Sequence, residues 1–163
     1  MIIYSTLENV SERVLFEANL KTMDPNGRLI KEVDLNMFSE MLKEHDYDPS
    51  ISVGAFDEET GECVGMVLNS ILKDREKTAY DIVTCTIPEY RRKGIARNIF
   101  EKVKVLLRER GIKRYITETK RTNTVAQNMY RALGFEIGSE VVTTLKTPNG
   151  SRQIEQVEVV MDL

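Results

Sequence analysis

One stretch of the sequence constrains the fold more than any other: a strand that ends at a proline and continues through a basic, glycine-containing loop into a helix. Tyr80 to Ile87 is rich in β-branched residues, and Pro88 cannot donate to a strand ladder, so a strand is predicted to end there. After Gly94 the apolar residues recur at helical spacing: Ile95, Ile99, Phe100, Val103, Leu106 and Leu107. The pattern therefore predicts that a helix begins within Arg91–Ala96.

A helix that begins at this loop makes a binding site for an anion. Its first backbone N–H groups have no partner within the helix, and the helix dipole favours negative charge in front of them. Gly94 has no side chain to block a close approach, and Ala96 has almost none. Arg91, Arg92 and Lys93 precede Gly94 and add positive charge. The loop is therefore predicted to bind a pyrophosphate, although a short glycine motif is also compatible with an ordinary basic helix start.

A second set of residues follows this loop in order. Gly111 is predicted to end the long helix, and Lys113–Thr119 is the next strand, parallel to the Tyr80 strand because a helical crossover joins them. A shorter helix carries Asn123-x-x-Ala126-x-x-x-Tyr130 and ends at Leu133-Gly134-Phe135. With Arg91-x-x-Gly94-x-Ala96, this order resembles the GCN5-related N-acetyltransferase (GNAT) superfamily, whose acetyl-CoA loop has the form Arg/Gln-x-x-Gly-x-Gly/Ala. The resemblance covers residues 51–137 well and the rest of the chain in outline.

The resemblance implies one GNAT domain over residues 1–163. Its class would be α+β, with a central mixed but mostly antiparallel sheet of about seven strands, about four helices, and a splay between strands 4 and 5. Outside the matching stretch, local patterns predict further strands at Met1–Ser5, Ile51–Phe56, Cys63–Leu72, Val141–Lys146 and Ile154–Met161. They also predict one helix after Asn9-x-x-Glu12 and a second helix capped by Asp34. The buried face of the second helix would consist of Met37, Phe38, Met41 and Leu42.

The resemblance also assigns residues that would bind acetyl-CoA. In this family the pantetheine arm enters the gap between the two splayed strands. By position, the pantetheine amides and the thioester carbonyl would meet the backbone of Thr84, Cys85 and Thr86. The pyrophosphate would meet the backbone of Arg91, Arg92, Lys93, Gly94, Ile95 and Ala96. Asn123 matches a family position that contacts the cofactor near its thiol end.

Two side chains are candidates for the chemistry. Acetyl transfer to an amine requires a base for the nucleophile, a polarised thioester and an acid for the leaving thiolate. Tyr130 matches the position that commonly donates to the departing sulfur, and a phenol is protonated at neutral pH; the alternative is that it only packs. Glu118 matches a glutamate that some members, including those that acetylate protein N-termini, use as general base. The alternative for Glu118 is a strand-end carboxylate that faces solvent or pairs with Lys120 or Arg121.

Composition narrows the class of protein. The chain has 163 residues, of which 41% are apolar and 30% charged, as in soluble globular domains. No apolar run is long enough to span a bilayer, and no basic residue precedes Arg13, so neither a membrane partner nor an export signal is expected and the protein is predicted to be cytoplasmic. Cys63 and Cys85 lie in predicted strands and are expected to be buried thiols. His45 is the one histidine, and no ligand cluster is apparent, so no metal is expected.

The two halves of the chain differ in charge. Residues 1–90 contain 18 acidic and 8 basic residues, whereas residues 91–163 contain 8 acidic and 15 basic ones. The twelve Lys and Arg residues of the segment 91–121 leave open a nucleic-acid-binding module that uses this basic face. The chain as a whole is acidic and carries no nucleic-acid-binding motif, so no nucleic-acid partner is expected. A further alternative is a GNAT-fold protein that binds acyl-CoA but uses another acyl donor or catalyses nothing.

The expected function is an acetyl-CoA-dependent N-acetyltransferase that moves the acetyl group directly to a primary amine. The acceptor would be a small-molecule amine or a peptide or protein amine, and a homodimer is left open. Residues 40–62 contain eight acids and one base, Lys43. If this segment borders the acceptor mouth, it would attract a cationic acceptor; the alternative is that these carboxylates solvate a distant face.

Overall fold

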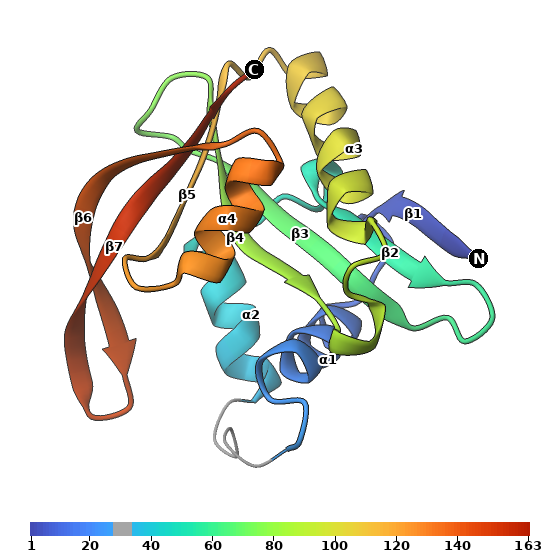
Figure 1. Cartoon of the computed structure of the whole chain (residues 1–163). Helices are drawn as coiled ribbons and strands as arrows, with labels where there is room; N and C mark the ends of the chain where they lie inside the picture. Colours follow the sequence, from blue (N-terminus) through green and yellow to red (C-terminus); the bar gives the residue numbers. More distant parts are fainter. Residues whose placement is uncertain (28–33) are drawn as a thin grey trace.

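The computed structural model describes residues 1–27 and 34–163, and this part of the chain forms one seven-stranded sheet with four α-helices (Figure 1). The strands are β1 (Ile2–Thr6), β2 (Val53–Asp57), β3 (Cys63–Ile71), β4 (Thr78–Thr86), β5 (Arg114–Lys120), β6 (Glu136–Thr147) and β7 (Gly150–Asp162). The helices are α1 (Glu12–Met23), α2 (Leu35–Glu44), α3 (Ile95–Glu109) and α4 (Thr124–Ala132). None of these helices is both long and apolar enough to cross a lipid bilayer.

The sheet has the order β1-β2-β3-β4-β5-β7-β6 and is antiparallel except between β4 and β5. These two strands are parallel because α3 carries the chain back between them. Their pairing covers three residue pairs and ends at Tyr80 opposite Ile116. Beyond this point the strands diverge, so the predicted fold class and the predicted splay between strands 4 and 5 are confirmed.

Helices cover both faces of the sheet and divide the core into two parts. In Figure 1, α3 and α4 lie on one face, and α1 and α2 lie on the other. The first core joins α3 to the sheet through Ile99, Phe100, Val103, Leu107, Val64, Val67 and Tyr115. The second core joins α1 and α2 to the sheet through Leu15, Phe16, Phe38, Leu42, Met66 and Leu68. Strand β3 is buried on both faces, which explains its nearly continuous apolar sequence.

The helix starts agree with the sequence patterns in one case and differ in the other. Asp34 caps α2 as predicted, because its carboxylate accepts a hydrogen bond from the Met37 N–H at 2.9 Å. The cap of α1 is Ser11 instead of Asn9, and Ser11 Oγ accepts from the Val14 N–H at 3.4 Å. The predicted capping arrangement at Asn9 is therefore wrong, and the polar residue nearest the apolar run provides the cap.

The buried face of α2 is narrower than predicted. Phe38 and Leu42, one helical turn apart, are buried, and Met41 is half-buried. Met37 is 45% exposed, so its predicted burial is wrong. This ten-residue helix packs against α1 and the sheet along one narrow row of side chains. Met37 lies outside this row and does not join the packed cluster.

The boundaries of β2, β6 and β7 also differ from the predictions. Strand β2 begins at Val53 because Pro49–Ile51 forms a 3-10 turn, in which Asp48 accepts a hydrogen bond from the Ser50 N–H at 2.9 Å. Strands β6 and β7 are longer than predicted and leave only residues 148 and 149 between them. They form a long twisted hairpin along one side of the molecule (Figure 1, dark orange to red). The expected Asn149-Gly150 turn is present, with Gly150 at a φ of 132° as the first residue of β7.

Candidate active site

A groove of about 820 Å³ lies where β4 leaves β5 and faces the first turns of α3 and α4. Nine of the ten predicted cofactor-binding residues line it: Thr84, Cys85, Thr86, Arg91, Arg92, Gly94, Ile95, Ala96 and Asn123. The fold also brings to the groove residues that the sequence did not single out as cofactor ligands: Thr22, Tyr90, Arg97, Thr119, Val125, Ala126 and Met129. Arg97 could have been anticipated, since it belongs to the first turn of a helix already predicted to face an anion.

The N-terminus of α3 opens onto this groove. The helix begins at Ile95, and Gly94 caps it with a φ of 79°, a left-handed conformation that glycine adopts at little cost. The first helical backbone bond runs from the Asn98 N–H to the Gly94 carbonyl at 3.0 Å. The preceding helical N–H groups, of Ile95, Ala96 and Arg97, therefore have no partner within the helix. Since all three residues line the groove, this end of α3 has the geometry and the charge of an anion-binding site.

The three cations before Gly94 have different positions. Arg91 lines the groove, and its Nε donates to the Thr86 carbonyl at 3.1 Å, which ties the loop to the end of β4. Arg92 also lines the groove and has a φ of 63°, unusual for a residue with a side chain. Lys93 does not line the groove; its ammonium lies 5.2 Å from the centre of the Tyr90 ring. Of the predicted cofactor residues, Lys93 is thus the one that the fold does not bring to the groove.

The last residues of β4 offer a free backbone edge to the groove. One edge of this segment pairs with β3, through Thr84 opposite Val67 and Thr86 opposite Gly65. The other edge has no strand beside it, because β5 pairs with β4 only up to Tyr80. Backbone donors and acceptors of Thr84–Thr86 on this edge are therefore available to an extended ligand, as a strand edge is to an added strand.

Tyr130 lines the groove from α4, but its hydroxyl is directed at a neighbouring carboxylate. Its side chain is 7% exposed, and its ring lies edge-on to Phe135 and Phe100 with centroids 5.3 and 6.4 Å away. The hydroxyl donates to Oδ2 of Asp81 at 3.1 Å. Burial, followed by the charge of Asp81, raises the pKa of Tyr130 well above its ordinary value. The phenol therefore keeps its proton at neutral pH, and it both packs in the core and reaches the groove.

Asp81 is a functional candidate that the sequence analysis missed. It is 2% exposed, and its Oδ2 also accepts a hydrogen bond from Thr84 Oγ1 at 2.5 Å. Burial raises the pKa of Asp81 to about 6, against the opposing effect of the hydrogen bonds from Thr84 and Tyr130. The signal available in the sequence was an acidic residue inside a strand otherwise made of apolar, β-branched and hydroxyl residues.

Glu118 lies outside the groove and is held by a tyrosine. It is half-buried and does not line the groove, although its neighbour Thr119 does, because successive strand residues face opposite sides of the sheet. Tyr80 of β4 donates its hydroxyl to Glu118 across the gap between the two strands. The ring of His45, which follows α2, stacks on Tyr80 with centroids 6.2 Å apart. Glu158 of β7 lies opposite Glu118 in the sheet register.

The alternative in which Glu118 only neutralises a neighbouring cation finds no support in the described residues. Arg121 pairs instead with Glu155 at 2.6 Å and with Glu140 at 3.8 Å. Glu118 accepts a hydrogen bond from Tyr80, and no ion pair between Lys120 and Glu118 is found in the part of the chain that the structure describes. Glu118 thus lies just beyond the paired part of β4 and β5, with a hydroxyl donor beside it.

Asn123 and the cysteines have structural roles that the fold makes visible. The Asn123 side chain caps α4 by accepting from the Ala126 N–H at 3.1 Å, and the residue also lines the groove. Cys63 and Cys85 are buried free thiols, as predicted. Burial raises the pKa of the two thiols, to about 12 for Cys63 and about 11 for Cys85, so neither is a thiolate at neutral pH. Within residues 1–27 and 34–163, no three His, Cys, Asp or Glu side chains are grouped as metal ligands would be.

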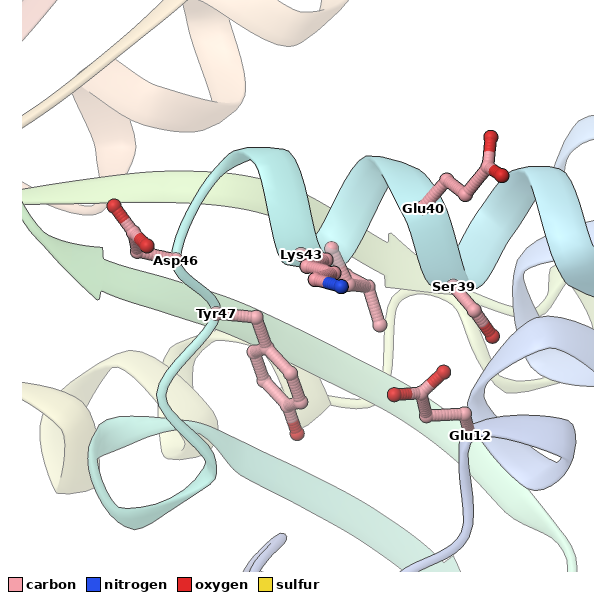
Figure 2. Close-up of a pocket in the computed structure, with 7 residues that line it drawn as sticks. Glu12, Ser39, Glu40, Lys43, Asp46 and Tyr47 are labelled. Atoms are coloured by element: carbon pink, nitrogen blue, oxygen red, sulfur yellow. The ribbon is translucent and has the colours of Figure 1, made fainter.

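A second cavity of about 500 Å³ lies beside α2 and the start of α1 and shares no lining residue with the groove. Figure 2 shows the carboxylate of Glu12 and the hydroxyl of Tyr47 directed into one space, with Glu40 turned away from it. Burial raises the pKa of Tyr47, so its hydroxyl is neutral, and it has no hydrogen-bond partner among the described residues. The acidic residues of the segment 40–62 therefore do not form a single negatively charged surface. Glu40 and Asp46 lie at this cavity, whereas Asp57 accepts a hydrogen bond from the Tyr90 hydroxyl at 2.6 Å.

Comparison with known proteins identifies the family. The model of the acetyltransferase (GNAT) family matches residues 17–135 of the chain. The chain belongs to this family. The match runs from the middle of α1 to just beyond α4 and so contains every residue that lines the groove and the Tyr80–Glu118 pair. No curated protein matches the chain significantly in sequence.

Solved structures of GNAT proteins share the fold of this chain at low sequence identity. The ribosomal-protein-S18-alanine N-acetyltransferase of Escherichia coli superposes with a TM-score of 0.72 at 17% identity, covering 99% of this chain and 94% of the other. A chain of the NatC complex bound to Gag peptide and CoA gives 0.70 at 18% identity, covering 99% and 98%. The PaiA N-acetyltransferase of Thermoplasma acidophilum in complex with coenzyme A gives 0.70 at 15% identity, covering 100% and 99%.

Proposed function

We propose that this GNAT chain transfers an acetyl group from acetyl-CoA directly to a primary amine. The observation that carries the proposal is the groove at the β4–β5 splay, which joins three features: an open helix N-terminus, a free strand edge and a buried phenol. A helix N-terminus can bind the pyrophosphate, and a free strand edge can hydrogen-bond to the pantetheine amides. A protonated phenol can donate its proton to the leaving thiolate. The CoA-bound GNAT structures of the same fold support this assignment.

On the donor side, each part of the groove would have a separate task. The N–H groups of Ile95, Ala96 and Arg97, with the cations around them, would bind the pyrophosphate. Backbone groups of Thr84–Thr86 would hold the pantetheine and polarise the thioester carbonyl. Tyr130 would donate its proton to the departing sulfur. Bound acetyl-CoA would supply the acyl group in an activated thioester.

On the acceptor side, Glu118 would take the proton of the attacking amine, directly or through water. Its position at the splay but outside the groove lets an amine approach from the side opposite to the cofactor. Tyr80 holds this carboxylate in place by its hydrogen bond, whereas Glu158, opposite it in the sheet register, pairs with Arg75 at 3.5 Å. The carboxylate of Glu118 favours an ammonium over an anion, so a cationic amine carrier is the class of acceptor that we propose. Of the similar structures, one is a ribosomal-protein-alanine N-acetyltransferase and another is bound to a Gag peptide and CoA, and the α-amine of a peptide falls in this class.

The state of the thiols supports a direct transfer. An acetyl-cysteine intermediate would need a thiolate near the thioester, and the thiol of Cys85, on the groove-lining end of β4, is packed in the core behind the sheet. Its raised pKa, about 11, keeps it protonated. Both substrates would therefore bind before either product leaves.

The alternative of a nucleic-acid-binding face is weakened by where the basic residues lie. Arg110 pairs with Asp48 and Arg121 pairs with Glu155, so part of the positive charge is neutralised. Lys93 stacks on Tyr90 and does not extend a continuous phosphate track. If the donor carries a longer acyl chain, kcat/KM should be higher for a longer acyl-CoA thioester than for acetyl-CoA.

Steady-state kinetics test the proposal. Rates of CoA release are measured over a matrix of acetyl-CoA and amine concentrations, with propionyl-CoA and longer acyl-CoA thioesters as comparison donors. We expect acceptor-dependent release, intersecting double-reciprocal lines, and the highest kcat/KM with acetyl-CoA. Parallel lines would contradict direct transfer, and a preference for a longer chain would contradict the choice of donor.

A further inference from the structure

Asp81 occupies the point at which the sheet opens. It follows Tyr80, the last residue of β4 that pairs with β5. Cross-strand pairing with β3 passes from Asp81 opposite Asn69 to Val83 opposite Leu68, so Ile82 is an extra residue without a partner. This bulge belongs to the strand end that lines the groove. Thr117 of β5 donates to the Asp81 carbonyl at 2.9 Å and fixes the backbone across the gap.

The two oxygens of the Asp81 carboxyl group have unequal surroundings. Oδ2 accepts from Tyr130 at 3.1 Å and from Thr84 at 2.5 Å. Oδ1 is buried and has no hydrogen-bond partner among the described residues. A bare buried oxygen disfavours the charged carboxylate, and in the neutral form a proton that faces Tyr130 would lie on Oδ2.

The geometry has a direct consequence for Tyr130. A phenol has one hydrogen, and in this structure that hydrogen points at Asp81 and not at the groove. An ionised Asp81 holds the hydrogen there. A neutral Asp81 can instead donate its own proton to the phenol oxygen, and the hydroxyl is then free to turn toward a sulfur in the groove.

We propose that Asp81 is a positioning residue and proton reserve for Tyr130: in its neutral form it releases the phenol to protonate the leaving thiolate and then restores the proton of the phenol. This inference rests on the proposed function. In the step, the O–H bond of Tyr130 breaks as the S–H bond of CoA forms. The carboxyl proton of Asp81 passes to the phenolate oxygen, and the resulting carboxylate keeps the hydrogen bonds seen here. A proton from solvent restores the acid after the products leave.

The groups around Asp81 determine its pKa, and therefore the pH range in which the neutral acid is available to Tyr130. The titratable groups affected by its charge are Tyr80 and Cys85 on its own strand, Tyr115 on β5 and Tyr130 on α4. All four have raised pKa values and are neutral at neutral pH, and no lysine or arginine among the described residues forms an ion pair with Asp81. Its pKa of about 6 is therefore set by burial against the hydrogen bonds from Thr84 and Tyr130. Acetyl transfer should fall as the pH rises through the pKa that Asp81 has in the loaded enzyme.

The test is the pH profile of kcat at saturating acetyl-CoA and acceptor, from about pH 5.5 to pH 9.5. Wild type should show a falling limb at high pH, whereas Asp81→Asn should lose this limb and have a lower kcat at low pH, because the amide can donate a hydrogen bond to the phenol oxygen at every pH but cannot return a proton to it. Tyr130→Phe should also lose the limb and lower kcat. Thr84→Val should move the limb up by about one pH unit, because a hydrogen bond that favours the carboxylate is removed. Infrared titration of wild type against Asp81→Asn should show a protonated buried carboxyl group over the same pH range.

The outcomes separate this inference from the proposed function. Acetyl transfer with a falling limb that persists unchanged in Asp81→Asn overturns the role of Asp81 and leaves the acetyltransferase in place. A loss of activity in Asp81→Asn with a parallel loss of CoA affinity and thermal stability also overturns it, since that pattern is purely structural. Absence of acceptor-dependent transfer in wild type and every variant overturns the proposed function itself, while the infrared titration still reports the carboxyl.

Discussion

Replacing Asp81 by asparagine should stabilise the protein at neutral pH and remove part of the pH dependence of its stability. Burial raises the pKa of Asp81 from an ordinary value of 3.8 to about 6. The folded state therefore binds this proton more tightly than the unfolded state does. The contribution of the neutral acid is fully present below about pH 4 and is lost as the pH rises to about 6, after which it stays constant.

The size of the effect follows from the two pKa values. At about 1.4 kcal/mol per pKa unit, the displacement of Asp81 corresponds to about 3 kcal/mol of stability lost between about pH 4 and pH 7. Asparagine has nearly the same shape, can form hydrogen bonds with Thr84 and Tyr130, and cannot ionise. The variant should thus gain about 2–3 kcal/mol over wild type at pH 8, or about 5–10 °C in Tm for a chain of this size. At about pH 4 the gain should be close to zero.

Urea and thermal unfolding at intervals from about pH 4.5 to pH 8.5 measure this difference. Asp74→Asn is a matched control for the removal of one carboxyl group, because Asp74 lies exposed in the loop before β4. A constant difference between Asp81→Asn and wild type over the whole range would refute the reasoning, because it would show that Asp81 is ionised to the same extent in the folded and unfolded states.

Three further predictions concern the groove and its acceptor. In calorimetry, Gly94→Glu should weaken CoA binding at least about tenfold more than Gly94→Gln. Both side chains carry the cost of a positive φ, but only the glutamate places a negative charge next to the pyrophosphate. Equal affinities of the two variants would show that no phosphate lies there. Gly65→Ala should lower the free energy of unfolding by about 1–3 kcal/mol and weaken CoA binding. The added Cβ would lie 3.0 Å from Ile95 Cγ2, at the start of α3, and 3.3 Å from the Cys85 carbonyl oxygen. An unchanged urea midpoint would be inconsistent with this packing. The KM of a cationic acceptor should rise with salt, since exposed charges are screened over about 10 Å at 0.1 M; a neutral best acceptor with a KM indifferent to salt would contradict electrostatic attraction.

The groove that we assign to the acyl donor was predictable in outline because its signals are local. A strand that ends near Pro88, a helix that begins within Arg91–Ala96 and the helical spacing after it are each set by neighbouring residues, and the structure places these elements as predicted. The residues of the motif also follow one another in chain order. Such local rules locate a helix N-terminus and a strand end even when the rest of the fold is unknown.

What the sequence did not provide depends on contacts between distant segments. Asp81 and Tyr130 are 49 residues apart, and nothing near either residue indicates that one hydrogen-bonds to the other. The strand pattern puts Glu118 and Thr119 on opposite faces, but only the fold shows which face holds the groove. The exposure of Met37 and the cap at Ser11 were mispredicted for a similar reason, because tertiary packing and cap geometry chose among several residues that suited the local pattern.

Transfer of an isotopically labelled acetyl group tests the central claim most directly. Acetyl-CoA labelled in the acetyl carbons is incubated with the protein and with a set of amines that includes polyamines, lysine-rich peptides and peptides with free α-amines, each beside its N-blocked counterpart. At least one free amine should acquire the label on its nitrogen, and its blocked counterpart should not. One labelled acetyl group should be transferred for each CoA thiol released. Release of CoA thiol at the same rate with and without every amine, with no labelled amide in the mass spectrum, would contradict it.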